Sequence, residues 1–191
     1  MSVTSTMLAL GTKAPGFSLP DISGESVSLD DFDQKALLVA FICNHCPYVG
    51  HVREGLVQLG RDYKGTDAAI VAIASNDPGQ YPEDGPEGMK AEAATFGYEF
   101  PYLYDETQEV AAAYTAMCTP DFFLFDGERE LVYRGRFDGS RPNSDDPVTG
   151  EELRAAIEAV LHDQPVSGEQ YPSMGCNIKW RPGNEPPYYI T

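Results

Sequence analysis

Two cysteines separated by two residues are the feature of this sequence best suited to chemistry: Cys43-Asn44-His45-Cys46. A thiolate is the nucleophile of disulfide exchange, and a free cysteine, with a pKa of about 8.5, is mostly protonated at neutral pH. A helix N-terminus stabilises a thiolate through its unpaired N–H groups and partial positive charge. Two intervening residues let both sulfurs share one helical turn. The spacing therefore predicts a redox pair, with protonated His45 able to lower the thiol pKa further.

The segments around this pair predict the elements that position it. Ala36–Ile42 and Ala68–Ala74 are continuous apolar runs, which are typical of strands buried on both faces. Between them an apolar stripe at spacings of three and four predicts a helix, and strand–helix–strand implies a right-handed parallel crossover. The other predicted elements are a hairpin of 17–19 with 27–29, helices over 86–96, 106–116 and 151–161, a strand over 102–104, and a hairpin of 121–125 with 131–137.

This order of elements is mixed α/β, with strands that form a central mixed sheet between helices. Residues 1–163 are predicted to form one domain. The segment 164–191 is rich in proline and glycine and is predicted to be a C-terminal tail that wraps this domain.

Size and charge exclude several classes of function. The chain has 191 residues, 42% of them apolar, and a formal net charge of −17, so we expect one acidic globular domain with neither nucleic-acid nor membrane partners. It contains no run of 18 apolar residues, and Met1–Leu10 lacks the basic region of a signal peptide. These observations predict a cytoplasmic protein. In the cytoplasm, cysteines are more often reactive or metal-binding than joined in structural disulfides.

Two other interpretations of the cysteines remain open. The pair could be inert small core residues. A zinc site would need another Cys or His pair at ligand spacing, which the sequence lacks, although Cys118 with Cys43 and Cys46 could make an incomplete soft-metal site. We expect neither a metal nor an organic cofactor.

A second motif, Cys118-Thr119-Pro120, precedes the predicted strand DFFLF, and 14–21 reads APGFSLPD. On these motifs the sequence resembles the thioredoxin superfamily, and within it the redoxin branch of alkyl hydroperoxide reductase and thiol-specific antioxidant proteins, over about residues 10–162. The resemblance implies a thioredoxin-like fold with an N-terminal hairpin and a C-terminal extension. It also implies that Pro120 is a cis residue and that Thr119 offers backbone hydrogen bonds to a substrate chain.

The tail carries a third matching piece. Residues 176–183, CNIKWRPG, resemble the resolving-cysteine segment of two-cysteine peroxiredoxins. Those proteins also carry Thr-x-x-Cys-Pro, which Cys43-x-x-Cys46-Pro47 overlays, and they need an arginine near the thiolate, for which Arg134 or Arg136 could serve. A cysteine at position 43 departs from that pattern and favours disulfide exchange over peroxide reduction.

The sequence therefore predicts a thiol–disulfide oxidoreductase that acts on protein or small-molecule disulfides and is recycled by a thiol electron donor. In this prediction Cys43, as the more exposed thiol, attacks, and Cys46 resolves the mixed disulfide. One alternative is an antioxidant thiol peroxidase with Cys46 peroxidatic and Cys43 or Cys176 resolving. Another is a metal-binding or redox-sensing module. We expect Cys176 not to pair with Cys46, because a tail thiol must first overcome loop-closure entropy.

Overall fold

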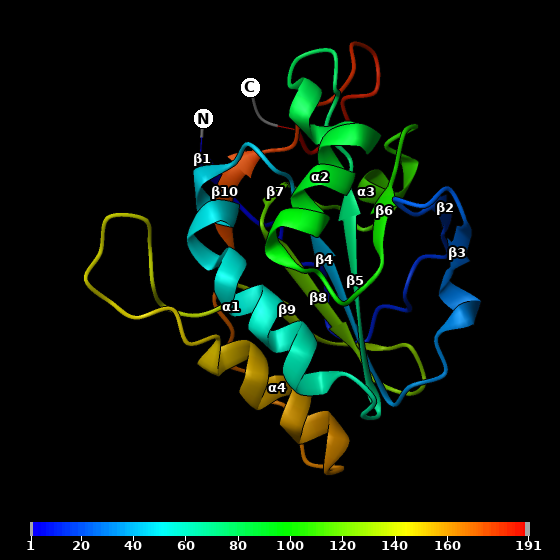
Figure 1. Ribbon diagram of the computed structural model, residues 1–191. Coiled ribbons are helices and arrows are strands. Elements are labelled where there is room, and N and C mark those ends of the chain that lie inside the picture. The colour runs from blue at the N-terminus through cyan, green and yellow to red at the C-terminus, as the bar shows by residue number, and fades with distance from the viewer. Residues whose placement is uncertain (1, 190–191) are drawn as a thin grey trace.

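The structure, a computed structural model, describes residues 2–189 and is built on one five-stranded sheet (Figure 1). The strand order is β6-β5-β4-β8-β9. Strands β4, β5 and β6 are mutually parallel, and β8 and β9 are antiparallel to their neighbours. The strands of this sheet are β4 (Ala36–Phe41), β5 (Ala68–Ala74), β6 (Tyr102–Tyr104), β8 (Asp121–Phe125) and β9 (Leu131–Gly135).

Helices α1 (Pro47–Tyr63) and α4 (Glu151–Leu161) cross one face of this sheet (Figure 1). Alternation along β4 explains the two cores: Leu38 and Ala40 face these helices, whereas Leu37 and Val39 face the other side. Helices α2 (Pro86–Phe96) and α3 (Glu109–Ala113) complete the layers. Both faces are apolar, as the continuous hydrophobic runs predict.

The remaining strands lie outside the main sheet. Strands β2 (Ser18–Pro20) and β3 (Ser26–Ser28) form the predicted N-terminal hairpin. A second, three-stranded sheet has the order β1-β10-β7 and joins β1 (Ser2–Thr4), β10 (Met174–Asn177) and β7 (Cys118–Thr119). The predicted tail thus contributes a strand next to the Cys118-Thr119-Pro120 motif; residues 190–191 of that tail lie outside the described residues.

Two predicted elements are shorter in the structure. The predicted helix 106–116 is shorter as α3 and starts only at Glu109, because Gln108 has a left-handed backbone (φ 66°) and its side chain donates to the carbonyl oxygens of Ser75 and Lys179. The predicted strand 131–137 ends at Gly135, where φ is 143° and the Tyr171 carbonyl approaches so closely that a Cβ would overlap it. Contacts with segments distant in sequence therefore set the start of α3 and the end of β9.

Across residues 2–189, no helix is long and apolar enough to cross a membrane.

Candidate redox site

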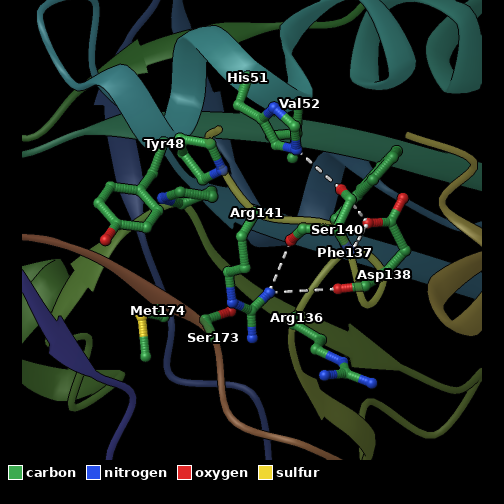
Figure 2. Close-up of a pocket in the computed structure, with 12 residues that line it drawn as sticks. Tyr48, His51, Val52, Arg136, Phe137, Asp138, Ser140, Arg141, Ser173 and Met174 are labelled. Atoms are coloured by element: carbon green, nitrogen blue, oxygen red, sulfur yellow. Dashed lines mark hydrogen bonds between the residues drawn. The ribbon is translucent and has the colours of Figure 1, made fainter. Parts of the chain in front are cut away.

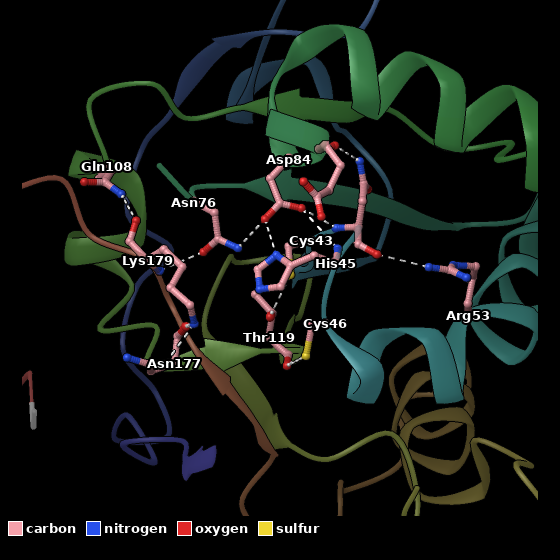
Figure 3. A network of polar contacts seen from close by, with 12 residues as sticks. Cys43, His45, Cys46, Arg53, Asn76, Asp84, Gln108, Thr119, Asn177 and Lys179 are labelled. Atoms are coloured by element: carbon pink, nitrogen blue, oxygen red, sulfur yellow. Dashed lines mark hydrogen bonds and ion pairs between the residues drawn. The ribbon is translucent and has the colours of Figure 1, made fainter. Parts of the chain in front are cut away.

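Cys43 and Cys46 lie at the junction of β4 and α1 (Figure 3). Cys46 is the N-cap residue of α1, and Pro47 occupies its first turn, where a missing N–H is tolerated. Both cysteines are only 1% exposed. The pair is therefore at a helix N-terminus, as the spacing predicts, but exposure does not distinguish the two thiols, so the expectation that Cys43 is the more exposed is wrong.

The Thr119–Pro120 segment faces both thiols because β8 pairs with β4, which brings Asp121 opposite Phe41. Cys43 Sγ lies 3.1 Å from Thr119 Oγ1, and Cys46 Sγ lies 3.2 Å from the Thr119 carbonyl oxygen. The Thr119–Pro120 peptide bond is cis, as the resemblance implies. One residue thus contacts both sulfurs of the pair.

The two thiols have opposite electrostatic environments. The pKa of Cys46 is lowered to about 4, chiefly because Cys43 donates a hydrogen bond to its sulfur; burial opposes this, and Cys176 and the Val49 N–H act in the same direction as Cys43. The pKa of Cys43 is raised, first by that shared hydrogen bond, then by burial and the charge of Asp84. The Cys46 thiol also donates to the Thr119 carbonyl oxygen, and this interaction favours its protonated form. The lowered pKa of Cys46 and the raised pKa of Cys43 favour Cys46 as the sulfur that ionises first.

His45 is held by the buried carboxylate of Asp84, which no sequence motif marks as part of the site. Its Nδ1 lies 2.5 Å from Asp84 Oδ2, and its ring stacks on Tyr81 with centroids 3.7 Å apart. Asp84 is fully buried and also accepts hydrogen bonds from the Asn44 and His45 amides and from the Asn76 side chain. The carboxylate fixes the loop between the two cysteines (Figure 3).

The order of the strands, rather than a sequence motif, is what places Asp84 near the cysteine pair. Residues 76–88 read as a surface loop because they are polar and rich in proline and glycine. That loop follows β5, which is parallel to β4, so it leaves the sheet at the same edge as Cys43. An acidic residue there can reach the cysteine loop.

Asp84→Asn is expected to destabilise the protein by about 2–3 kcal/mol near neutral pH, because it removes a buried acceptor from several donors. Burial raises the pKa of Asp84, but hydrogen bonds from His45, Asn76 and Asn44 outweigh it, so the pKa lies below the ordinary 3.8. Its stabilisation is therefore present above 3.8 and lost as pH falls through the lowered pKa. Urea denaturation across this acid range checks both effects.

Glu83→Gln is the matched control, because Glu83 is the exposed neighbour in the same turn. It is expected to stay within about 0.5 kcal/mol of the wild type. An Asp84→Asn protein as stable as this control would contradict the role given to the carboxylate.

Three side chains here have the composition of a metal site. Ligand atoms of Cys43, His45 and Asp84 lie within 4.8 Å of one another. However, Cys43 Sγ already lies 3.1 Å from Thr119 Oγ1, and the Asp84 oxygens accept hydrogen bonds from Asn44, His45 and Asn76. These donors fit a hydrogen-bonded loop better than a cation.

The remaining cysteines differ in position. Cys118 is fully buried, its Sγ lies 3.6 Å from the Pro120 carbonyl oxygen, and burial raises its pKa well above the ordinary value. Cys176 lies in β10 opposite Thr119, whose carbonyl oxygen is 3.2 Å from Cys46 Sγ. It packs against the apolar cluster that contains Cys43 and Cys46. The structure therefore brings Cys176 to the pair and directs Cys118 elsewhere.

The two arginines considered for a peroxide site are engaged away from the thiols. Arg134 donates to the Leu8 carbonyl oxygen and the Gln170 side chain. Arg136 pairs with Glu152 and lies over the Tyr171 ring, 4.4 Å from its centroid. Neither guanidinium is therefore available to a peroxide bound at Cys46 without rearrangement.

A small pocket lies beside Pro120, between α1, the loop after β9 and the start of β10 (Figure 2). His51 Nε2 lies 2.8 Å from Ser140 Oγ, and Arg141 donates to the Ser140 carbonyl oxygen. Tyr48 and Met174 also line it. The pocket is an opening on the Pro120 side of the site.

Residues 10–134, more than half of the chain, match the sequence pattern of the AhpC/TSA family. The chain belongs to the AhpC/TSA family. This AhpC/TSA chain is 28% identical over 157 residues to "Thiol-disulfide oxidoreductase ResA" of Geobacillus kaustophilus, covering 81% of this chain and 80% of that protein. The match to the ResA of Halalkalibacterium halodurans is 25% identical and covers 64% of this chain and 65% of that protein. "Putative peroxiredoxin Rv2521" of Mycobacterium tuberculosis is 31% identical, and the match covers 59% of this chain and 67% of that protein.

Solved structures extend the comparison. An uncharacterized conserved protein from Geobacillus kaustophilus superposes with a TM-score of 0.94 at 54% identity, over 96% of this chain and 98% of that one. A thioredoxin family protein from Chlorobium tepidum superposes with a TM-score of 0.62 at 19% identity, over 80% of this chain and 98% of its own, and shows the fold alone. The predicted thioredoxin-like fold and redoxin relationship are confirmed.

Proposed function

We propose that this AhpC/TSA protein is a thiol–disulfide oxidoreductase whose redox centre is the Cys43–Cys46 pair. The observation that supports this most is the geometry of the pair: both sulfurs lie at the N-terminus of α1 and both contact Thr119, the residue before the cis Pro120. The lowered pKa of Cys46 and the raised pKa of Cys43 suit the same chemistry, because one thiol ionises more readily than the other. A thiolate attacks a disulfide sulfur, and a neighbouring thiol then displaces the mixed disulfide. The relatives named ResA support the same chemistry.

The charge favours Cys46 as the attacking sulfur, which reverses the order predicted from the sequence. The Cys46 thiolate attacks a substrate sulfur, forms a mixed disulfide and expels the other substrate sulfur as a thiolate. Cys43 then attacks Cys46, releases the second substrate thiol and leaves the Cys43–Cys46 disulfide. A thiol donor returns the pair to its dithiol state. Substrates are protein or small-molecule disulfides.

Mild oxidation is expected to produce an intramolecular Cys43–Cys46 disulfide, and the protein is expected to catalyse insulin reduction by dithiothreitol. Peptide mapping after acid quench measures the first, and turbidity measures the second. Both thiols free after oxidation, with no catalysis above buffer, would refute the proposal. Stoichiometric metal in the purified protein would instead support a metal-binding module.

An antioxidant thiol peroxidase is the second candidate. Cys46 followed by Pro47 at the start of α1, with a pKa of about 4, favours it. The engagement of Arg134 and Arg136 elsewhere disfavours it. Consumption of hydrogen peroxide faster than reduction of insulin, with sulfenic acid on Cys46 in Cys43→Ser, would support the peroxidase.

A further inference from the structure

Strand β10 places a third cysteine, Cys176, beside the redox site. Within the small sheet, Cys176 pairs with Thr119 and Asn177 with Cys118. Beyond the strand, the Ile178 N–H donates to the Met117 carbonyl oxygen at 3.2 Å. Ile178 and Trp180 are 1% and 5% exposed. This buried apolar anchor fixes the strand, so Cys176 has a defined position beside Cys46.

Loop-closure entropy does not keep Cys176 from Cys46 in the folded protein, in contrast to what the sequence alone predicts for a thiol in the tail. In the structure the tail is already held by β1 on one side and β7 on the other. Because pairing of β10 closes the loop during folding, no such penalty remains when a disulfide forms.

Cys176 differs from the pair in its accessibility. Cys43 and Cys46 are each 1% exposed, whereas Cys176 is partly exposed. An external thiol or disulfide must approach a sulfur directly, since exchange is a displacement at sulfur. Of these three cysteines, Cys176 is the most exposed to solvent.

The electrostatics of Cys176 depend on the redox state of Cys46. Burial raises the pKa of Cys176 to about 11, and the hydrogen bond and charge of Cys46 add to it. When Cys46 is in a disulfide, it has no charge, so its contribution to the Cys176 pKa disappears. Cys176 is therefore a weaker nucleophile in the reduced protein and a stronger one in the oxidised protein.

We propose that Cys176 is a third redox residue, through which thiols outside the protein reduce the buried Cys43–Cys46 disulfide. This inference rests on the proposed oxidoreductase function and adds how its buried disulfide is reached.

The transfer of electrons from an external thiol through Cys176 to the Cys43–Cys46 disulfide is a relay that balances without a further oxidant. The Cys176 thiolate attacks Cys46 Sγ of the Cys43–Cys46 disulfide; the Cys46–Cys176 disulfide forms, and Cys43 leaves as a thiolate that takes up the proton lost by Cys176. An external thiolate then attacks Cys176 Sγ and expels the Cys46 thiolate, whose low pKa makes it a good leaving group. A second external thiol displaces Cys176 from the mixed disulfide, so two external thiols are oxidised to one disulfide and the protein is reduced.

The test compares reduction of the oxidised full chain by reduced glutathione in wild type and in Cys176→Ser and Cys176→Ala. Samples are acid-quenched, alkylated and mapped. We expect both variants to be reduced at least about tenfold more slowly than wild type, because glutathione must then reach a buried sulfur. The two variants differ in hydrogen bonding, so equal slowing identifies the thiol rather than local packing as the cause.

A second arm traps the proposed disulfide. Cys43→Ser oxidised with oxidised glutathione is expected to contain an intramolecular Cys46–Cys176 disulfide on a non-reducing gel and in the peptide map. If instead Cys46 carries only glutathione, and Cys176→Ser is reduced at the wild-type rate, the relay is refuted while insulin reduction by wild type upholds the oxidoreductase. If wild type forms no Cys43–Cys46 disulfide and reduces no insulin, the proposed function fails and the relay fails with it.

Discussion

Cys46→Ser is expected to lower disulfide reductase turnover at least about a hundredfold, because a serine hydroxyl is not ionised where the thiolate stood. The same substitution is expected to remove the ultraviolet absorbance of a thiolate, which in wild type should appear with a midpoint near the Cys46 pKa of about 4. Insulin reduction and an absorbance titration measure the two effects.

Cys43→Ser is the matched comparison, because the two residues are equally buried. It is expected to keep the thiolate absorbance, with a pKa nearer the ordinary value since the largest hydrogen bond to Cys46 is lost or weakened. It should retain more turnover than Cys46→Ser, because Cys46 can still pair with Cys176. A stable mixed disulfide on Cys43 in Cys46→Ser would contradict this order and restore Cys43 as the attacking sulfur.

Gly175→Ala is expected to destabilise the protein by about 2–3 kcal/mol, because the new Cβ would overlap the Thr119 carbonyl oxygen across the β10–β7 pairing. Backbone must shift to relieve this overlap, and the shift moves Cys176 away from Cys46. Reduction of the oxidised protein by glutathione should therefore also slow. Thermal or urea denaturation gives the stability, and the quenched alkylation assay gives the rate.

Gly168→Ala is the control within the same tail, since a Cβ there meets no atom within 4 Å. This substitution is expected to leave the free energy of unfolding unchanged or to raise it by up to about 1 kcal/mol, because alanine lowers the conformational entropy of the unfolded chain. A Gly175→Ala protein that behaves like Gly168→Ala in both assays would show that β10 does not hold Cys176 against the site.

Local patterns predict the main sheet and the position of the cysteine pair. The continuous apolar runs become β4 and β5, the stripe between them becomes α1, and the predicted helix 86–96 is α2. These elements follow from burial and periodicity within one segment, which a single sequence displays directly. The resemblance adds the cis bond at Pro120.

Partners distant in sequence explain what the patterns miss. Asp84 reads as a loop carboxylate because its donors come from the cysteine loop and Asn76. Similarly, four residues of a proline- and glycine-rich tail form β10 only because β1 and β7 lie on either side. Neither hydrophobic periodicity nor spacing encodes such pairings, so the contact of Cys176 with Cys46 could not be derived from them.

The placement of β10 between β1 and β7 has a consequence for biosynthesis. The Ser173 N–H donates to Ser5 Oγ where β10 meets β1, and these two residues are 168 positions apart. The small sheet therefore cannot assemble while the ribosome still holds the downstream segment. Until then Cys46 lacks the Cys176 contact, and the edge of β7 is unpaired. The nascent chain thus carries an incomplete thiol site, and its redox chemistry matures only once the far segment has docked.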